Sequence, residues 1–270
     1  MKRLEGKIAL VTSGTRGIGL QTVKTLAANG ATVYIGARRL DAAQEICEEL
    51  EVDNYKAKPV YFDATKEETY KTMVEEVIKY AGRIDILVNN FGTTDAQKDK
   101  NLVDGDTDTF FDTVNTNLKS VYLPCKAVVP YMIENGGGSI INISSIGGSV
   151  PDISRIGYGV SKSGVNNITQ QIAMQYAKNK IRCNAVLPGM IATDAVASNM
   201  PEDFQKSFLS HVPLNRMGKP EDIANAVAFF ASDDSSYITG CVMEVSGGYH
   251  LGTPQYADFV GRKVAENAKI

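Results

Sequence analysis

The chain has 270 residues, of which 43% are hydrophobic and 22% are charged, and its formal net charge is −3. This composition is typical of a globular protein with a sizeable core, and one α/β domain can reach this length. The chain has no basic excess for nucleic acid, and no apolar run approaches the roughly 18 residues of a membrane span. The four scattered cysteines contain no CxxC pair, so we expect no metal site and no disulfide framework, and a reducing cytoplasm.

Short apolar runs alternate along the chain with amphipathic segments. Seven runs predict buried strands, at 7–13, 32–37, 58–64, 84–90, 139–144, 181–189 and 241–247. Helical periodicity predicts helices over 18–28, 40–51, 66–80, 110–132, 157–178 and 221–232, with a weaker, partly helical segment at 190–211. Pro124 and Pro130 lie inside the fourth helix, so we expect a kink or interruption near each.

Near-continuous apolar strands that alternate with helices indicate a parallel sheet covered on both faces. We therefore expect the α/β class: a single Rossmann-like, doubly wound domain over residues 1–250, with a seven-stranded parallel sheet. Residues 251–270 are more polar, and we expect them to form a C-terminal tail packed near the substrate site or a subunit interface.

A glycine-containing turn joins the first strand to the first helix. Such a turn places backbone N–H groups at the positive end of a helix dipole, where they can bind a pyrophosphate. Gly17 and Gly19 allow close approach, because a Cβ there would collide with the phosphates. The pattern therefore predicts a dinucleotide site rather than a merely structural turn. The residues expected to surround the phosphates are Thr12, Ser13, Gly14, Thr15, Arg16, Gly17, Ile18 and Gly19.

The end of the second strand indicates which dinucleotide binds. NAD sites usually carry an acid here for the ribose 2′-OH, but this strand runs into Arg38 and Arg39, with no acid before Asp41. A guanidinium can grip a 2′-phosphate with two hydrogen bonds, and Arg16 can add a further positive charge. We predict NADP(H), with NAD as the second choice. The alternative is that both arginines form an ordinary solvated strand end.

The string YGVSK places Tyr158 and Lys162 on one face of a helix, near its start. A phenol titrates at about pH 10, and an adjacent ammonium or a cationic nicotinamide lowers its pKa. The phenol can then accept an alcohol proton as hydride leaves, or donate it in the reverse direction. Ser144 and Ser145 follow the fifth strand, where a hydroxyl can hydrogen-bond the reacting oxygen. Chance or core packing could explain the string by itself.

The string YGVSK becomes stronger evidence for an acid/base pair because several other motifs accompany it. The full set is TSGTRGIG at 12–19, NNFG at 89–92, SS at 144–145, YGVSK at 158–162, PGMIAT at 188–193 and SGG at 246–248. On these motifs the chain resembles the single-domain short-chain dehydrogenases over nearly its whole length. The resemblance implies a nicotinamide-dependent oxidoreductase. It also implies a homotetramer that pairs subunits through the helices containing Asn117 and Tyr158.

The resemblance further implies roles for individual residues. Tyr158 would be the acid/base, Lys162 would bind the nicotinamide ribose and lower the tyrosine pKa, and Ser145, rather than Ser144, would position the substrate. Asn117 would support a water-mediated proton path to the lysine. The remaining cofactor contacts would be Asp63 and Ala64 at the adenine, Asn90 in the fourth strand, and Ile191 and Thr193 at the carboxamide.

Two positions depart from the family pattern. Ser13 stands where the family usually has glycine, and we expect Gly14 to relieve the turn. Phe91 stands where alanine is usual, and we expect its ring to reshape the wall near the cofactor.

More narrowly, the chain is similar to bacterial hydroxysteroid dehydrogenases that act on the 7α- and 12α-hydroxyls of bile acids. Segments that carry this similarity include MKRLEGK, SVYLPCKA, VPDISRIGY, FLSHVPLNR and GTPQYAD. It implies reversible, NADP-dependent oxidation of a bile-acid α-hydroxyl, at position 12 or 7, to the ketone. Two alternatives stay open: a reductase of 3-oxoacyl or other small carbonyl substrates, and a non-catalytic dinucleotide-binding sensor. Segment 190–211 and the tail near Tyr256 are apolar enough for a lid over a steroid, or for an oligomer contact.

Overall fold

The computed structural model describes residues 2–194, 196, 200–253 and 255–267. Seven strands form one sheet in the order β3-β2-β1-β4-β5-β6-β7, and all neighbouring strands are parallel. The strands are β1 Ile8–Thr12, β2 Thr32–Ala37, β3 Lys56–Tyr61, β4 Ile86–Asn89, β5 Gly138–Ile143, β6 Ile181–Pro188 and β7 Val242–Val245. The strand order reverses between β1 and β4, so the predicted doubly wound, seven-stranded parallel sheet is confirmed.

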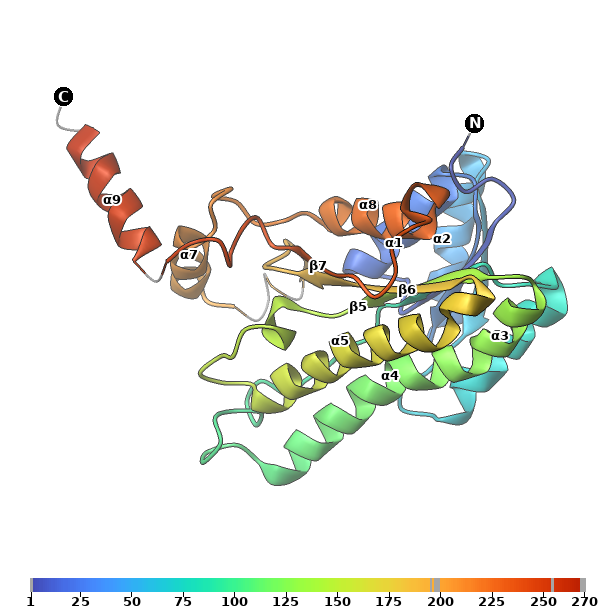
Figure 1. The fold of residues 1–270 in the computed structure, drawn as a ribbon, viewed down its shortest axis with the longest axis horizontal. Coiled ribbons are helices and arrows are strands. Elements are labelled where there is room, and N and C mark those ends of the chain that lie inside the picture. Colours follow the sequence, from blue (N-terminus) through green and yellow to red (C-terminus); the bar gives the residue numbers. More distant parts are fainter. Residues whose placement is uncertain (1, 195, 197–199, 254, 268–270) are drawn as a thin grey trace.

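Helices cover both faces of the sheet, with α1, α2 and α8 on one side and α3, α4 and α5 on the other (Figure 1). They are α1 Gly17–Ala28, α2 Leu40–Val52, α3 Glu68–Ala81, α4 Thr107–Glu134, α5 Ile156–Tyr176 and α8 Pro220–Ala231. Side chains alternate along each strand: Ala9 and Val11 pack under the first group of helices, and Leu10 packs under the second. Two apolar cores therefore enclose the sheet, as the continuous apolar runs predict.

Most predicted elements differ in their bounds by up to three residues, and two of the differences have a clear physical cause. Strand β3 ends at Tyr61 rather than at residue 64, because Asp63 turns away from the sheet and its N–H is bound by Thr69 Oγ1 at 3.2 Å. Helix α4 runs unbroken through Pro124 and Pro130, so an interruption is wrong, whereas a kink near each proline stays a prediction. Its packing against α3 and α5 outweighs the N–H groups that the two prolines lack.

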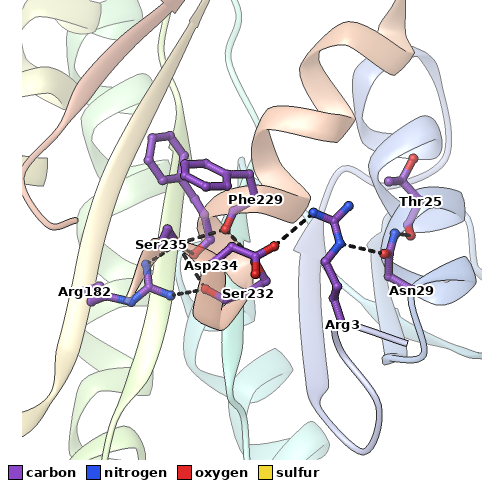
Figure 2. Close-up of polar contacts among 9 residues, drawn as sticks. Arg3, Thr25, Asn29, Arg182, Phe229, Ser232, Asp234 and Ser235 are labelled. Atoms are coloured by element: carbon purple, nitrogen blue, oxygen red, sulfur yellow. Dashed lines mark hydrogen bonds and ion pairs between the residues drawn. The ribbon is translucent and has the colours of Figure 1, made fainter. Parts of the chain in front are cut away.

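The amino-terminal edge of the sheet is held by polar contacts (Figure 2). Arg182, at the start of β6, donates to Ser235 Oγ at 2.9 Å and to the Ser232 carbonyl at 3.1 Å. Arg3 donates to Asn29 and Asp234, which follow α1 and α8. These contacts tie the strand starts to the helix ends that meet them.

Two further helices, α7 Glu202–Ser210 and α9 Tyr256–Asn267, lie beyond the carboxyl-terminal edge of the sheet (Figure 1). Helix α9, which makes up most of the described part of the predicted tail, points away from the sheet past α7, and residues 254 and 268–270 of that tail lie outside the described residues. Its packing near a substrate site or a subunit interface stays a prediction. No helix in the described ranges is long and apolar enough to cross a membrane.

Candidate active site

The glycine turn lies where the strand order reverses, between β1 and β4. A Cβ on Gly19 would overlap the Ser13 carbonyl oxygen and lie 2.5 Å from Asn90 Nδ2, so the position accepts glycine only. Asn90, which follows β4, fixes this turn: its side chain donates to the Ser13 carbonyl at 3.1 Å and its N–H donates to Thr12 Oγ1 at 2.9 Å. Gly17 begins α1 with φ +52. We call this turn at the N-terminus of α1 the glycine cradle, because the helix N–H groups there can bind an anion.

Ser13 itself adopts the left-handed conformation that its usual glycine would favour. Its φ is +54, which costs a non-glycine residue about 1–2 kcal/mol. A Cβ on Gly14 would lie 2.9 Å from Ile35 Cγ2 and 3.0 Å from Val23 Cγ2, so this glycine is needed for close packing. The expectation that Gly14 relieves the turn is therefore wrong, and the strain stays at Ser13.

The second departure from the family pattern is Phe91, which follows β4. Its ring packs against the core under α3, α4 and α5. A cavity lies at the carboxyl-terminal edge of the sheet, called the main cavity below, and among the described residues that line it are the neighbours Asn90 and Gly92, but not Phe91. The expectation that this ring reshapes the wall near the cofactor is wrong, because the side chain faces the core.

The predicted adenosine end is open and positively charged. Arg38 and Arg39 are exposed directly after β2, and no ion pair of the described residues uses either of them or Arg16. Asp63 accepts hydrogen bonds from the N–H and hydroxyl of Thr65, at 3.0 and 2.8 Å. Burial acts to raise the pKa of Asp63, but these bonds and the charge of Arg38 lower it overall. Ala64, beside it, accepts a bond from the Tyr70 hydroxyl through its backbone carbonyl, at 3.0 Å.

Ser145, Tyr158 and Lys162 line one cavity of about 930 Å³ at the carboxyl-terminal edge of the sheet. Lys162 is only 3% exposed, and its Nζ donates to the Ile143 carbonyl at 2.9 Å and lies 5.7 Å from the centroid of the Tyr158 ring. Ser145 Oγ accepts the Gly147 N–H at 3.1 Å. Ser144 instead donates to the Lys162 carbonyl at 3.2 Å, which is a structural contact. The structure thus brings together the three side chains that the sequence singled out.

Burial dominates the protonation of this group. It lowers the pKa of Lys162 to about 8 and raises the pKa of Tyr158. The hydrogen bond with Ser145 and the charge of Arg155 oppose the second shift. The resemblance implied that Lys162 lowers the pKa of Tyr158. In the protein chain without a bound dinucleotide, burial raises this pKa overall, and the groups that act to lower it are Ser145 and Arg155.

Asn117 connects α4 to the loop that follows β4. It is 1% exposed, its Oδ1 accepts the Thr93 N–H at 2.9 Å, and its Nδ2 donates to the Thr93 carbonyl and to Ser161 Oγ, both at 2.9 Å. A Cβ on Gly92 would lie 2.8 Å from Lys162 Nζ, so this loop passes directly beside the ammonium. Asn117 therefore holds the loop that borders the lysine, and its support of a proton path stays a prediction.

The predicted carboxamide residues close the cradle from the opposite side. Ile191 is buried and bridges to Gly218, and the next N–H, from Ala192, donates to the Gly218 carbonyl at 2.8 Å. Thr193 Cγ2 would lie 3.4 Å from a Cβ on Gly17, so the threonine contacts the glycine turn. Both residues also line the main cavity.

The outer wall of the cavity is aromatic. Phe204 and Phe208 of α7 line it, and the Phe208 ring stacks on Tyr249 with centroids 4.5 Å apart and an interplanar angle of 5°. The apolar character of segment 190–211 indicated part of this wall. Tyr249 and Arg155 were missed, because a single aromatic after SGG and a single arginine before a helix carry no signal in one sequence.

Comparisons with known proteins agree with this geometry. A family model described as enoyl-(acyl carrier protein) reductase matches residues 13–250. The chain is 66% identical to the 7α-hydroxysteroid dehydrogenase of Paraclostridium sordellii, over 98% of this chain and 100% of the relative. It is 58% identical to that of Clostridium sardiniense, over 97% and 100%. A solved 7α-hydroxysteroid dehydrogenase in complex with NADH and 7-oxo-glycochenodeoxycholic acid matches with a TM-score of 0.86 at 32% identity, over 91% of this chain and 95% of that one.

Proposed function

This chain belongs to the short-chain dehydrogenase/reductase family, and from that premise we propose that it reversibly oxidises the 7α-hydroxyl of a bile acid to the ketone. The observation that carries the proposal is that Ser145, Tyr158 and Lys162 line the same cavity, whose wall also contains the aromatic rings of α7 and Tyr249. Full-length identity of 66% to a 7α-hydroxysteroid dehydrogenase supports position 7 rather than position 12. A rigid, largely apolar steroid suits such a wall.

The residues present fit a nicotinamide dinucleotide, because the glycine turn places the N-terminus of α1 where the strand order reverses, and Ile18 of that helix lines the same cavity as Tyr158 and Lys162. A bound nicotinamide would supply the hydride acceptor for oxidation and the hydride donor for reduction. The chain handles the proton: Tyr158 accepts it from the hydroxyl in oxidation and donates it in reduction. Ser145 hydrogen-bonds the reacting oxygen, and Lys162 places a buried positive charge below the phenol.

We also propose that the dinucleotide is NADP(H). The proposal is supported by Arg38 and Arg39, which are exposed directly after β2, and by Arg16, which is exposed in the glycine turn, because guanidinium groups there can bind a 2′-phosphate. The complex of the 32% identical relative holds NADH, so the choice of cofactor is argued from this chain's own arginines. We expect Arg38→Asp to lower the ratio of kcat/KM for NADPH over NADH by about tenfold or more, since the carboxylate repels the phosphate. The matched charge reversal Lys178→Asp, at the opposite edge, should leave the ratio unchanged; an unchanged ratio in Arg38→Asp would overturn the assignment.

A substrate panel tests the reaction. We expect turnover of chenodeoxycholic and cholic acids, which carry a 7α-hydroxyl, and none of deoxycholic acid, which lacks it. Turnover of deoxycholic acid would move the reaction to position 12 or 3. Reduction of an acetoacetyl thioester alone would favour the 3-oxoacyl reductase alternative, and dinucleotide binding without any turnover would favour the sensor.

Finally, we propose a homotetramer in the cytoplasm. The assembly is supported by the family and by large exposed apolar side chains on α4 and α5, including Phe111, Tyr122 and Val160. The location is supported by four free cysteines. Light scattering after size-exclusion chromatography tests the assembly, and a monomeric mass would contradict it.

A further inference from the structure

A buried carboxylate lies at the start of α5. Asp99, in the loop between β4 and α4, is 1% exposed. Its Oδ1 accepts the Gly157 N–H at 2.8 Å, and its Oδ2 accepts the Tyr158 N–H at 2.9 Å and the Thr94 hydroxyl at 2.7 Å. Burying a carboxylate is costly unless donors surround it, and these three donors provide that compensation.

Helix α5 depends on this loop for its cap. The first N–H groups of a helix have no partner within the helix. The N-cap residue Arg155 is left-handed, with φ +58, and its side chain makes no capping bond. The Arg155 N–H instead donates to the Asp99 carbonyl at 3.1 Å, and the Ile156 N–H donates to the Lys100 carbonyl at 3.2 Å. Four consecutive amides, 155–158, are thus bound by two residues that are distant in sequence.

We propose that Asp99 is a positioning residue that fixes the backbone of Tyr158, and with it the direction of the phenol toward Ser145 and the cavity. The inference rests on the proposed function only in that Tyr158 carries the proton. Asp99 anchors the residue that bears the phenol and the residue before it. Gly157 leaves room for this, since a Cβ there would lie 3.2 Å from Asp99 Oδ1 and 3.3 Å from the Phe110 backbone.

The same loop also borders the lysine. Thr93 is clamped by Asn117, and Gly92 passes beside Lys162 Nζ. The loop between β4 and α4 therefore contacts both titrating residues: Asp99 binds the backbone of Tyr158, and Gly92 lies beside the Lys162 ammonium. A shift of about 1 Å at a reacting group can cost on the order of 10²-fold in rate.

The test compares Asp99→Ala and Asp99→Asn with Asp106→Ala. Asp106 is the matched control, because its side chain caps α4 by accepting the Thr109 N–H at 2.8 Å, and no side-chain hydrogen bond found in the described ranges joins it to α5. We expect Asp99→Ala to lower kcat on the order of 10²-fold while the KM for the bile acid changes little. Asp99→Asn, which retains one acceptor oxygen, should recover part of the rate. Asp106→Ala should keep the wild-type kcat.

Amide hydrogen exchange supplies a readout that needs no turnover. The N–H groups of Gly157 and Tyr158 should exchange slowly in the wild type and Asp106→Ala, and faster in both Asp99 variants. If Asp99→Ala does not fold, the Asn variant carries both measurements.

Wild-type kcat in folded Asp99 variants, or slow exchange at both amides in them, would overturn the inference. An equal loss of kcat in Asp106→Ala would do so as well. If the wild type turns over no bile acid, the proposed function fails, whereas amide exchange still decides whether Asp99 holds the two amides.

Discussion

At the amino-terminal edge of the sheet, the Arg182 guanidinium is bound by Ser232 and Ser235 (Figure 2), whereas at the carboxyl-terminal edge the Lys162 ammonium donates to one backbone carbonyl and the Tyr158 phenol faces a cavity. Both edges hold a positive charge, half-buried at Arg182 and buried at Lys162. At the amino-terminal edge the Arg182 donors are used in hydrogen bonds within the fold, whereas at the carboxyl-terminal edge part of the donor capacity of Lys162 and Tyr158 is available to a ligand. We therefore expect substitutions at the amino-terminal edge to change mainly the free energy of unfolding, and substitutions at the carboxyl-terminal edge to change mainly kcat. The reason is that polar groups available to a substrate have few hydrogen-bond partners in the folded chain.

The comparison is tested most strongly at Lys162. We expect Lys162→Met to lower kcat by about 10²-fold or more, because the phenol loses its neighbouring charge. The melting temperature should stay level or rise, since burial already opposes the charged form and lowers its pKa to about 8. Steady-state kinetics and thermal unfolding measure both effects. A large drop in melting temperature with full turnover would reverse the roles of the two edges.

The reverse separation is expected at Arg182. Replacing it with Met leaves the Ser232 carbonyl and the Ser235 hydroxyl without this donor, so the free energy of unfolding should fall by about 1–3 kcal/mol. Denaturant titration measures the loss. The kcat should equal that of the wild type, and a tenfold lower kcat in a folded variant would show that this edge takes part in the chemistry.

Gly19 sharpens the comparison within the carboxyl-terminal edge. Gly19→Ala places a Cβ against the Ser13 carbonyl and Asn90, so the Kd for the dinucleotide should rise by about tenfold, or 1.4 kcal/mol. Fluorescence titration of the bound dinucleotide measures this change. Gly261→Ala, where a Cβ meets nothing within 4 Å, is the control. Equal affinity in both variants would argue against the cradle.

The smallest expected effect is at Ser13, where the carboxyl-terminal edge holds strain. Ser13→Gly should raise the free energy of unfolding by about 1 kcal/mol, because glycine adopts φ +54 freely. Ser13→Ala keeps a Cβ in the same conformation and should give no gain. A gain in the alanine variant would mean that the hydroxyl, rather than the backbone angle, causes the strain.

The sequence was sufficient for the sheet and for the central side chains of the site. Strand runs and helix periods are local signals, and parallel strands bring their carboxyl ends to one edge, where Ser145 and Tyr158 then meet. Helix α4 was harder, because its packing against α3 and α5 decides that a proline stays inside the helix. Asp99 gave no signal, since a cap supplied by a loop distant in sequence is visible only in three dimensions.

The departures from the family pattern show the same limit. Ser13 and Phe91 were visible as unusual residues, but their consequences depend on a backbone angle and on the direction of a ring. The Tyr158 pKa is a similar case. Spacing placed the lysine one turn away, whereas the direction of the pKa shift depends on burial.

One measurement tests the central claim most directly: the steroid product that the wild type and Tyr158→Phe form from chenodeoxycholic acid and the oxidised dinucleotide. We expect the wild type to form the 7-ketone, with one reduced dinucleotide for each ketone. Tyr158→Phe, folded and still able to bind the dinucleotide, should form about 10²–10⁴-fold less in the same time. A ketone at another ring position, or equal yields from the two proteins, would contradict the account.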